Sequence, residues 1–288
     1  MAAVAAIVAP PNAYAWGTAG HKLIMTRAID LLPAGLKPFF VAHRDEIVAR
    51  SVDPDLWRTA GWEDDPNHFV DFGAREYGEY PFSALPRDYS AALEKFGSAT
   101  LKRNGLLPWR EAEEFGNLRR TFEGFTRGAM YGAGNVVLFA PVACHYIQDA
   151  TQPLHATNNH DGQLTGNTGV HARFESAVIE RFAARLTIAP APPVPIRNAR
   201  DAAFDILLAS NRLVAEIMKA DSAAAAGKDV YDDDYYEKFF AGVKPMVERR
   251  LSDAITASAS LIIGAWEAAG KPPLTTDGTR PPEKVRKP

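Results

Sequence analysis

The sequence predicts an all-α fold, a compact multi-helix bundle, and three observations lead to that class. Apolar residues recur at helical spacing in eight segments, and no segment shows the convincing alternation of a strand ladder. The connections between these segments are short, which favours a compact bundle. The predicted helices are His21–Leu32, Leu36–Ala49, Tyr89–Phe96, Trp109–Arg127, Asn135–Ala150, Gly169–Leu186, Asn198–Lys219 and Tyr235–Ala269.

The predicted loops are marked by residues that end helices or form turns. They include Asp53-Pro54, Asp65-Pro66, Asn104-Gly105, the stretch 158–167 and the Pro-rich run 189–195. Because two long amphipathic helices follow the Pro-rich run, we interpret it as a stiff surface crossover within one domain. That domain is predicted to cover residues 16–270, and the Pro-, Lys- and Arg-rich tail 271–288 is predicted to be disordered.

The composition is that of an ordinary globular protein and excludes several classes. The chain has 288 residues, 47% hydrophobic and 23% charged, which excludes collagen-like, disordered and disulfide-scaffold proteins. The formal net charge of −3 gives no bulk basic field for nucleic acid or an anionic membrane. The single cysteine, Cys144, cannot form an internal disulfide and is interpreted as a small buried residue. No stretch is long and apolar enough to predict a transmembrane segment.

Residues 1–15 are interpreted as a secretory signal peptide. The segment is uncharged and ends in Ala13-Tyr14-Ala15, a small-x-small pattern that a signal peptidase cuts before Trp16. It lacks the usual basic start, since the first Lys or Arg is Lys22, so the true start codon and the alternative of a simple apolar N-terminus stay open. With cleavage, the mature protein is expected to be secreted or periplasmic.

Histidines beside carboxylates give the main functional signal of the sequence. His145 and Asp149 lie four residues apart on one predicted helix, as do His171 and Glu175 on another, and this spacing places both side chains on one helix face. His155 follows shortly after a Pro break. A single pair of this kind is more often a surface or capping pair. Two pairs joined by a further histidine indicate a metal site, and imidazole with carboxylate donors suits zinc better than calcium or magnesium.

Two motifs in this region resemble the superfamily of zinc-dependent phospholipases C and single-strand-specific zinc nucleases. The segment 145–158, HYIQDATQPLHATN, is similar to the central H-Y-x-x-D-x-x-Q-P-x-H-A-x-N motif of the phospholipase branch, with Gln148 where that branch usually has Gly. The segment 169–175, GVHARFE, is similar to its G-x-H-x-x-[FY]-E element. The nuclease branch more often has Asp in place of the residue at Glu175.

The N-terminal half carries further elements of the same resemblance. The segment 16–21, WGTAGH, resembles the mature start W-G-x-x-G-H, in which the free amine and carbonyl of the first residue bind zinc. The segment 68–71, HFVD, resembles the H-F-x-D element. An upstream carboxylate ligand matches best at Asp55, and Asp53 is the competing candidate.

The resemblance implies three zinc ions and assigns their ligands. Three of the ligand segments come from the N-terminal third of the chain and two from its centre, so only a folded bundle brings them together. The implied ligands are Asp55, His68, His145 and Asp149 for the first ion, His155, His171 and Glu175 for the second, and Trp16, His21 and a bridging Asp149 for the third.

The activity implied by the resemblance is hydrolysis of a phosphodiester bond by zinc-activated water, with Asp55 as a proton acceptor. The central motif and Glu175 favour a phospholipase C that releases diacylglycerol and a phosphorylated head group. The spacing from Trp16 to His21 favours the alternative, a single-strand-specific nuclease that releases 5′-nucleotides. Phe69 and Asp71 are expected to bind the substrate, as a stacked base or as a lipid head group. A zinc-stabilised binding protein without turnover is the second alternative, and no obligate protein partner is inferred.

Overall fold

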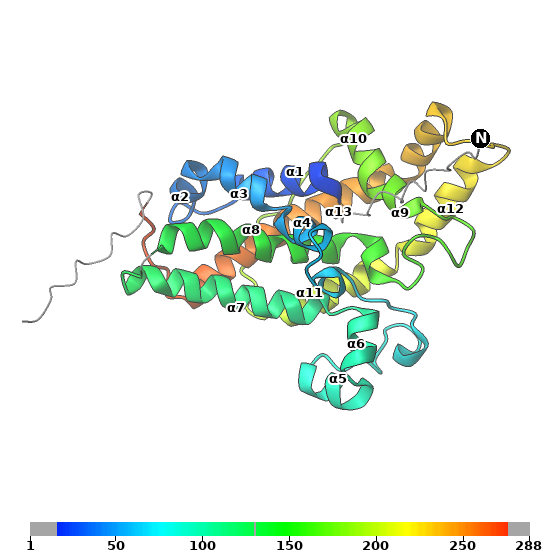
Figure 1. The fold of residues 1–288 in the computed structure, drawn as a ribbon. Coiled ribbons are helices and arrows are strands. Elements are labelled where there is room, and N and C mark those ends of the chain that lie inside the picture. Colours follow the sequence, from blue (N-terminus) through cyan, green and yellow to red (C-terminus); the bar gives the residue numbers. More distant parts are fainter. Residues whose placement is uncertain (1–15, 130, 276–288) are drawn as a thin grey trace, which may run out of the picture.

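The computed structural model describes residues 16–129 and 131–275 and confirms the all-α class (Figure 1). Within these residues there are helices and connecting loops but no strand. The segment 1–15, interpreted above as a signal peptide, lies outside the described residues, as do residues 276–288 of the tail. The α-helices are α1 (Gly17–Asp30), α2 (Lys37–Ala42), α3 (Arg44–Arg50), α4 (Asp53–Thr59), α5 (Tyr89–Phe96), α6 (Ser98–Asn104), α7 (Leu107–Thr126), α8 (Gly132–Thr151), α9 (Val170–Ala172), α10 (Val178–Phe182), α11 (Ala199–Asn211), α12 (Val214–Ala225) and α13 (Asp233–Ala268).

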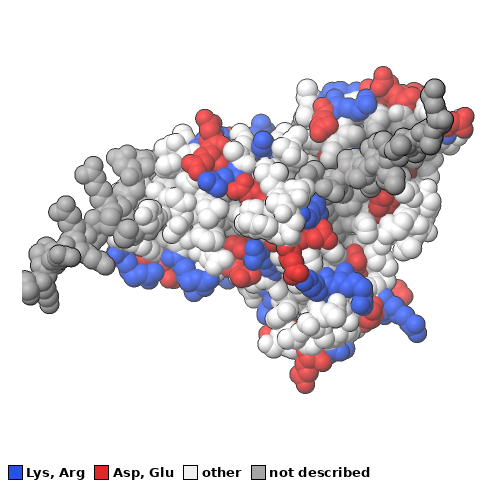
Figure 2. Space-filling view, in the orientation of Figure 1, with Lys and Arg blue, Asp and Glu red and all other residues white. Residues whose placement is uncertain are grey.

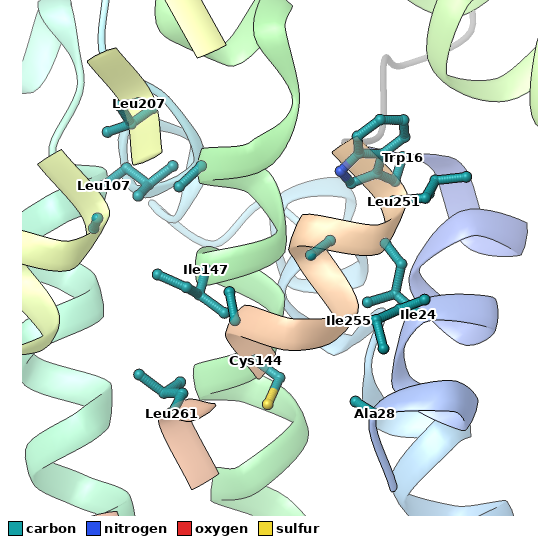
Figure 3. Packing of buried hydrophobic residues seen from close by; sticks show 14 of the residues in the cluster. Trp16, Ile24, Ala28, Leu107, Cys144, Ile147, Leu207, Leu251, Ile255 and Leu261 are labelled. Carbon is teal, nitrogen blue, oxygen red and sulfur yellow. The ribbon is translucent and has the colours of Figure 1, made fainter. Parts of the chain in front are cut away.

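Helix α8 is the centre of the bundle. Its sequence is apolar on nearly every face, and such a helix is buried on all sides in a globular protein. Helices α7, α11 and α13 pack along it, and α1, α3 and α4 cover another side. In Figure 3, Cys144 and Ile147 of α8 lie among apolar residues of α13, with Ile24 and Ala28 of α1 on the far side. Polar residues of α8 are therefore placed inside the core, where each of them needs a partner.

Short helices were the elements that the apolar pattern missed. Asp53-Pro54, predicted as a loop, forms the first turn of α4. Proline is tolerated there because the N–H that it lacks would have no partner within the first turn of a helix. Helix α6 was not predicted either. The predicted segment Leu36–Ala49 is divided at His43, which is half-buried against the ring of Phe39.

Two long predicted helices are also interrupted. The segment Gly169–Leu186 contains a π-helical turn, Arg173–Ala177, between α9 and α10. The segment Asn198–Lys219 is divided between α11 and α12, and α12 continues to Ala225. Single-turn π segments are frequent at functional sites, and this one carries a predicted ligand, Glu175.

The Pro-rich run crosses the surface along α13. The backbone N–H groups of Val194 and Ile196 donate to the side chain and the carbonyl of Ser260. A Cβ on Gly264 would lie 1.9 Å from the Ile196 carbonyl oxygen, so the close approach of the run requires a glycine there. After α13 the described part of the tail, 271–275, folds back, with the Trp266 indole donating to the Pro272 carbonyl at 2.9 Å.

The surface carries no single-sign field on the face drawn in Figure 2, where basic and acidic side chains alternate. This agrees with the small net charge of the chain. Among the described residues, no helix has the length and apolarity needed to cross a membrane.

Candidate metal centre

The predicted ligands converge on one side of α8. His145 and Asp149 lie one turn apart on that helix, α1 contributes His21, α4 contributes Asp55, and the 3-10 turn Asp65–His68 contributes His68. All five side chains are at most 1% exposed. Elements distant in the sequence thus bring three imidazoles and two carboxylates into the core. We call this set the deep wall.

Within the deep wall, Asp55, His68 and His145 form one group that could hold a metal ion. Asp55 Oδ1 lies 3.8 Å from His68 Nδ1 and 3.9 Å from His145 Nε2, and the two imidazole nitrogens are 3.2 Å apart. Asp149 Oδ2 lies 2.9 Å from His68 Nδ1 and 3.4 Å from His145 Nε2. The four side chains predicted to hold the first zinc therefore face one another.

His21 forms a second group with His145 and Asp149. Its Nε2 lies 3.4 Å from Asp149 Oδ1, and its ring stacks on His145 at a centroid distance of 4.1 Å. The two oxygens of Asp149 thus face the two groups separately. This geometry would allow Asp149 to bridge two ions, as the resemblance implies.

The third group, His155, His171 and Glu175, lies beyond the end of α8. Glu175 Oε2 is 2.8 Å from His171 Nε2 and 3.8 Å from His155 Nε2. Gln152 donates to the same oxygen at 2.9 Å. These three predicted ligands form what we call the open wall, because His155 and His171 also line a surface cleft.

The histidines are held by acceptors on the side that faces away from the groups. Metal-binding histidines usually donate their second ring nitrogen to such an outer partner, which fixes ring orientation and tautomer. His171 Nδ1 is the exception and has no hydrogen-bond partner among the described residues. The observed pairs are His21 Nδ1 with Gln148 Oε1 at 2.6 Å, His68 Nε2 with Asp64 Oδ2 at 3.0 Å, His145 Nδ1 with Ser51 O at 2.8 Å, and His155 Nδ1 with His68 O at 2.6 Å.

Several inward-facing atoms of these groups have no hydrogen-bond partner in the described part of the chain. They are His21 Nε2, both carboxylate oxygens of Asp55, Asp149 Oδ1 and Glu175 Oε1. A buried polar atom without a partner costs about 1–3 kcal/mol, and more when it is charged. Metal ions satisfy nitrogen and carboxylate donors together, so the residues fit bound divalent cations.

Burial controls the protonation of these groups. It raises the pKa of Asp55 to about 6 and lowers the pKa of His21 to about 3. Burial also acts to lower the pKa of His68, but hydrogen bonds to Asp149 and Asp64 outweigh it and raise that pKa to about 9. Because metal binding requires neutral imidazole and ionised carboxylate, a bound cation would displace a proton from His68 near neutral pH, and from Asp55 only below about pH 6.

The cleft beside the open wall has a volume of about 450 Å³. Phe69 and Asp71, predicted to bind substrate, line it together with His160. Burial, with a smaller contribution from the charge of Asp65, raises the pKa of Asp71 to about 7. Arg58 and Arg103 add positive charge to the lining.

The structure distinguishes the two candidates for the upstream carboxylate. Asp55 is one of the five side chains of the deep wall, whereas Asp53 is partly exposed and pairs with Arg50 at 3.2 Å. Cys144 is buried and donates to the Ser258 carbonyl, outside the three groups, as the interpretation of a small buried residue predicts.

Three side chains with roles at the site were missed in the sequence. Asp64 accepts from His68 and from the Tyr146 hydroxyl. Arg58 pairs with Asp55 at 3.5 Å. The two residues are three apart in sequence, a spacing that brings side chains together only in a helix, and α4 was not predicted. The Gln148 side chain contacts His21 Nδ1. The sequence showed only that Gln148 replaces the usual Gly, which does not predict this contact.

Trp16 is fully buried next to the deep wall. Its indole donates to the Gln148 carbonyl at 3.1 Å and to Thr151 Oγ1 at 2.9 Å, and its own carbonyl accepts from Gly20 N–H. A Cβ on Gly20 would lie 2.8 Å from the Trp16 Cβ, so this packing requires a glycine. Metal binding by the Trp16 amine and carbonyl stays a prediction.

The described residues thus contain three buried groups of histidine and carboxylate side chains that could hold metal ions. A scan against protein-family models and a search of the curated proteins both give no match for this chain. The geometry of the groups and the lining of the cleft carry the functional argument.

Proposed function

We propose that this protein is a zinc-dependent hydrolase of phosphodiester bonds. One observation carries the proposal: the predicted ligands, drawn from distant segments, meet in the core with five inward-facing polar atoms that have no hydrogen-bond partner among the described residues. A protein that did not bind cations would bear the full cost of those buried groups. The chemistry of the donors, imidazole with carboxylate, favours zinc.

The proposed ligands follow the three groups. Asp55, His68, His145 and Asp149 would hold one zinc, and the open wall would hold a second. His21 and Asp149 would hold a third together with the amine and carbonyl of Trp16, which requires cleavage after Ala15 and hence export of the chain. Bound zinc supplies Lewis acidity and makes hydroxide accessible near neutral pH.

The chain's own residues would bind and orient the phosphodiester. Arg58 and Arg103 line the cleft and offer guanidinium groups that match phosphate oxygens. Asp55 has two carboxylate oxygens without a hydrogen-bond partner in the described chain, so one can bind metal while the other accepts a proton. His155 and His171 of the open wall line this cleft, so a phosphodiester bound there would lie beside the predicted metal ligands.

Phospholipid is the first proposed substrate class, and the activity is that of a phospholipase C. The resemblance of the segments 145–158 and 169–175 supports it. A structural feature supports it as well: Leu56 on α4 and Trp62 just after it are 51% and 63% exposed. Indole side chains favour the membrane–water interface, and α4 also carries Arg58 of the cleft.

Single-stranded nucleic acid is the second proposed substrate class, with 5′-nucleotides as products. Phe69, Asp71 and Arg103 lie together in the cleft, where an aromatic ring, a carboxyl group and a cation could hold a base and its phosphate. If this is correct, Phe69→Ala should raise KM for single-stranded DNA by about 5- to 150-fold, because a stacked base is worth about 1–3 kcal/mol. An unchanged KM would exclude a stacking role for Phe69.

Three parallel assays test the proposal. Protein beginning at Trp16, loaded with zinc, is assayed with phosphatidylcholine in micelles, with single-stranded DNA and with a soluble aryl phosphodiester. We expect turnover of the soluble diester that a chelator abolishes and zinc restores. The first two substrates then rank the classes. Zinc binding without turnover of any of them would favour a zinc-stabilised binding protein.

A further inference from the structure

Gln148 is a polar residue in α8, a helix made mostly of apolar residues. It is fully buried on α8, next to Asp149, at the position where the motif of segment 145–158 usually has Gly. A glycine would leave α8 more flexible and would offer no side-chain partner. The amide of Gln148 instead makes two contacts that connect α1 with α13.

The hydrogen bonds around Gln148 fix the direction of its amide. Ser258 Oγ donates to the Ala254 carbonyl at 2.8 Å, so towards Gln148 it serves as an acceptor and receives the Gln148 Nε2 donor at 3.2 Å. The amide oxygen must then face His21, whose Nδ1 lies 2.6 Å away. Since a carbonyl oxygen only accepts, His21 must carry its proton on Nδ1.

This tautomer leaves the lone pair of His21 on Nε2. That nitrogen is 3.4 Å from Asp149 Oδ1, and both atoms lack a hydrogen-bond partner among the described residues. The arrangement is that of a metal-binding imidazole with an outer acceptor, except that an amide stands where a carboxylate or carbonyl is commonly found.

The backbone carbonyl of Gln148 contacts Trp16, the other predicted ligand from the N-terminal segment. The Gln148 carbonyl accepts from the Trp16 indole at 3.1 Å, and Thr151 Oγ1 supports that indole at 2.9 Å. His21 and Trp16 both belong to the N-terminal segment, which reaches α8 across more than 120 residues of sequence.

We infer that Gln148 is the positioning residue of the N-terminal metal group, orienting His21 through its side chain and Trp16 through its carbonyl. The inference rests on the proposed metal binding and concerns how that group is built. It assigns the Gln148 amide a role that glycine could not fill.

Three variants in the full chain separate positioning from simple packing. Gln148→Leu keeps the volume and removes the acceptor. Gln148→Glu keeps an acceptor for His21 Nδ1 and is the rescue variant. Ser258→Ala keeps the Gln148 acceptor but removes the partner that directs it. Circular dichroism and thermal unfolding check that each variant is folded.

The first measurement is the histidine tautomer, from long-range ¹H–¹⁵N correlation spectra of metal-free protein. We expect the Nδ1–H form of His21 in the wild type and in Gln148→Glu, and its loss in folded Gln148→Leu. Ser258→Ala should show a mixture of tautomers. The same Nδ1–H signal in wild type and Gln148→Leu would overturn the inference.

The second measurement is zinc content and competition with a chromophoric chelator, with zinc alone as the probe. Gln148→Leu should weaken one site by about 10- to 100-fold, the usual effect of an outer partner, and leave the others unchanged. Unchanged affinity at every site would also overturn the inference. A wild type that binds zinc but hydrolyses no phosphodiester would refute the proposed function and leave the role of Gln148 intact.

Discussion

The deep wall and the open wall use the same donor types in different surroundings. In the deep wall each imidazole has an outer acceptor, supplied by Gln148, Asp64 and the Ser51 carbonyl, and the whole set is enclosed by helices. In the open wall His171 Nδ1 has no such partner in the described chain, and the set borders the cleft. Of the five deep-wall side chains only His68 lines the cleft, whereas two of the three open-wall side chains, His155 and His171, line it.

The local backbone follows the same division. His145 and Asp149 sit on a continuous helix, which keeps their separation fixed. Glu175 sits on a π-helical turn, and the polar contact that holds it besides the histidines comes from Gln152. Loss of a ligand in the open wall should therefore affect turnover strongly while leaving the fold and the deep wall intact.

The largest expected effect follows from removing the open-wall carboxylate. Glu175→Ala should bind about one zinc fewer and lower kcat/KM by more than about 100-fold, since loss of an outer partner alone costs about 10- to 100-fold. Zinc analysis and turnover of a soluble phosphodiester measure both quantities. Glu180→Ala, on the exposed face of α10, is the matched control. Full activity in Glu175→Ala would show that the open wall is not the reactive site.

A smaller effect is expected in the deep wall when an outer acceptor is altered. Asp64→Asn weakens the acceptor of His68 Nε2 and should reduce zinc affinity at that group by about 10- to 100-fold. Competition titrations with a chelator measure this change. Asp53→Asn should change nothing, because Asp53 pairs with Arg50 outside the groups. The opposite result, with Asp53→Asn losing zinc, would reverse the choice between Asp55 and Asp53.

The N-terminal end of the deep wall gives a third comparison. In a chain that retains residues 1–15, the nitrogen of Trp16 is a planar amide and a poor ligand. We expect that chain to bind about one zinc fewer than protein beginning at Trp16 and to turn over substrate more slowly. Zinc content and rate are measured side by side for the two forms. Equal values would make Trp16 a packing residue only.

The sequence allowed the long helices and the ligand set to be predicted, and for different reasons. Long helices such as α7 and α13 follow from apolar periodicity, which depends on near neighbours alone. Helices α4 and α6, of seven residues each, are too short to show a period. The divisions at His43 and at the π turn depend on packing that the local pattern does not contain.

The candidate site divides in the same way. The candidate ligands could be predicted because their residue types and spacings form a motif, and the structure brings the predicted side-chain ligands into three groups. The outer partners Asp64 and Gln148 were not identified, because their roles arise from contacts to His68 and His21 that only the folded chain makes. Arg58 depends on α4, which the sequence had not predicted.

The last prediction concerns a buried acid behind the deep wall, with no effect expected on turnover. Glu111 on α7 is fully buried, and neither carboxylate oxygen has a hydrogen-bond partner among the described residues. Burial raises its pKa well above the ordinary value, helped by the charges of Glu114 and Asp149 and opposed by Arg110. A raised carboxyl pKa means that the folded state holds its proton when the unfolded state has released it. Below about pH 4.5 the carboxyl group is protonated in both states, and its titration does not change the free energy of unfolding. Above that pH the unfolded state releases the proton first, so the free energy of unfolding decreases as pH rises.

Glu111→Gln removes that dependence because the amide does not titrate. Relative to wild type, its free energy of unfolding should increase by about 1.4 kcal/mol for each pH unit above the ordinary glutamate pKa, until the folded-state pKa is reached. Denaturant unfolding at a series of pH values from 4 to 8 measures the difference. Glu113→Gln, on the exposed side of the same helix, is the matched control. A constant difference between Glu111→Gln and wild type over this range would mean that Glu111 is ionised in the folded protein, and that the deep wall tolerates a further negative charge behind Asp149.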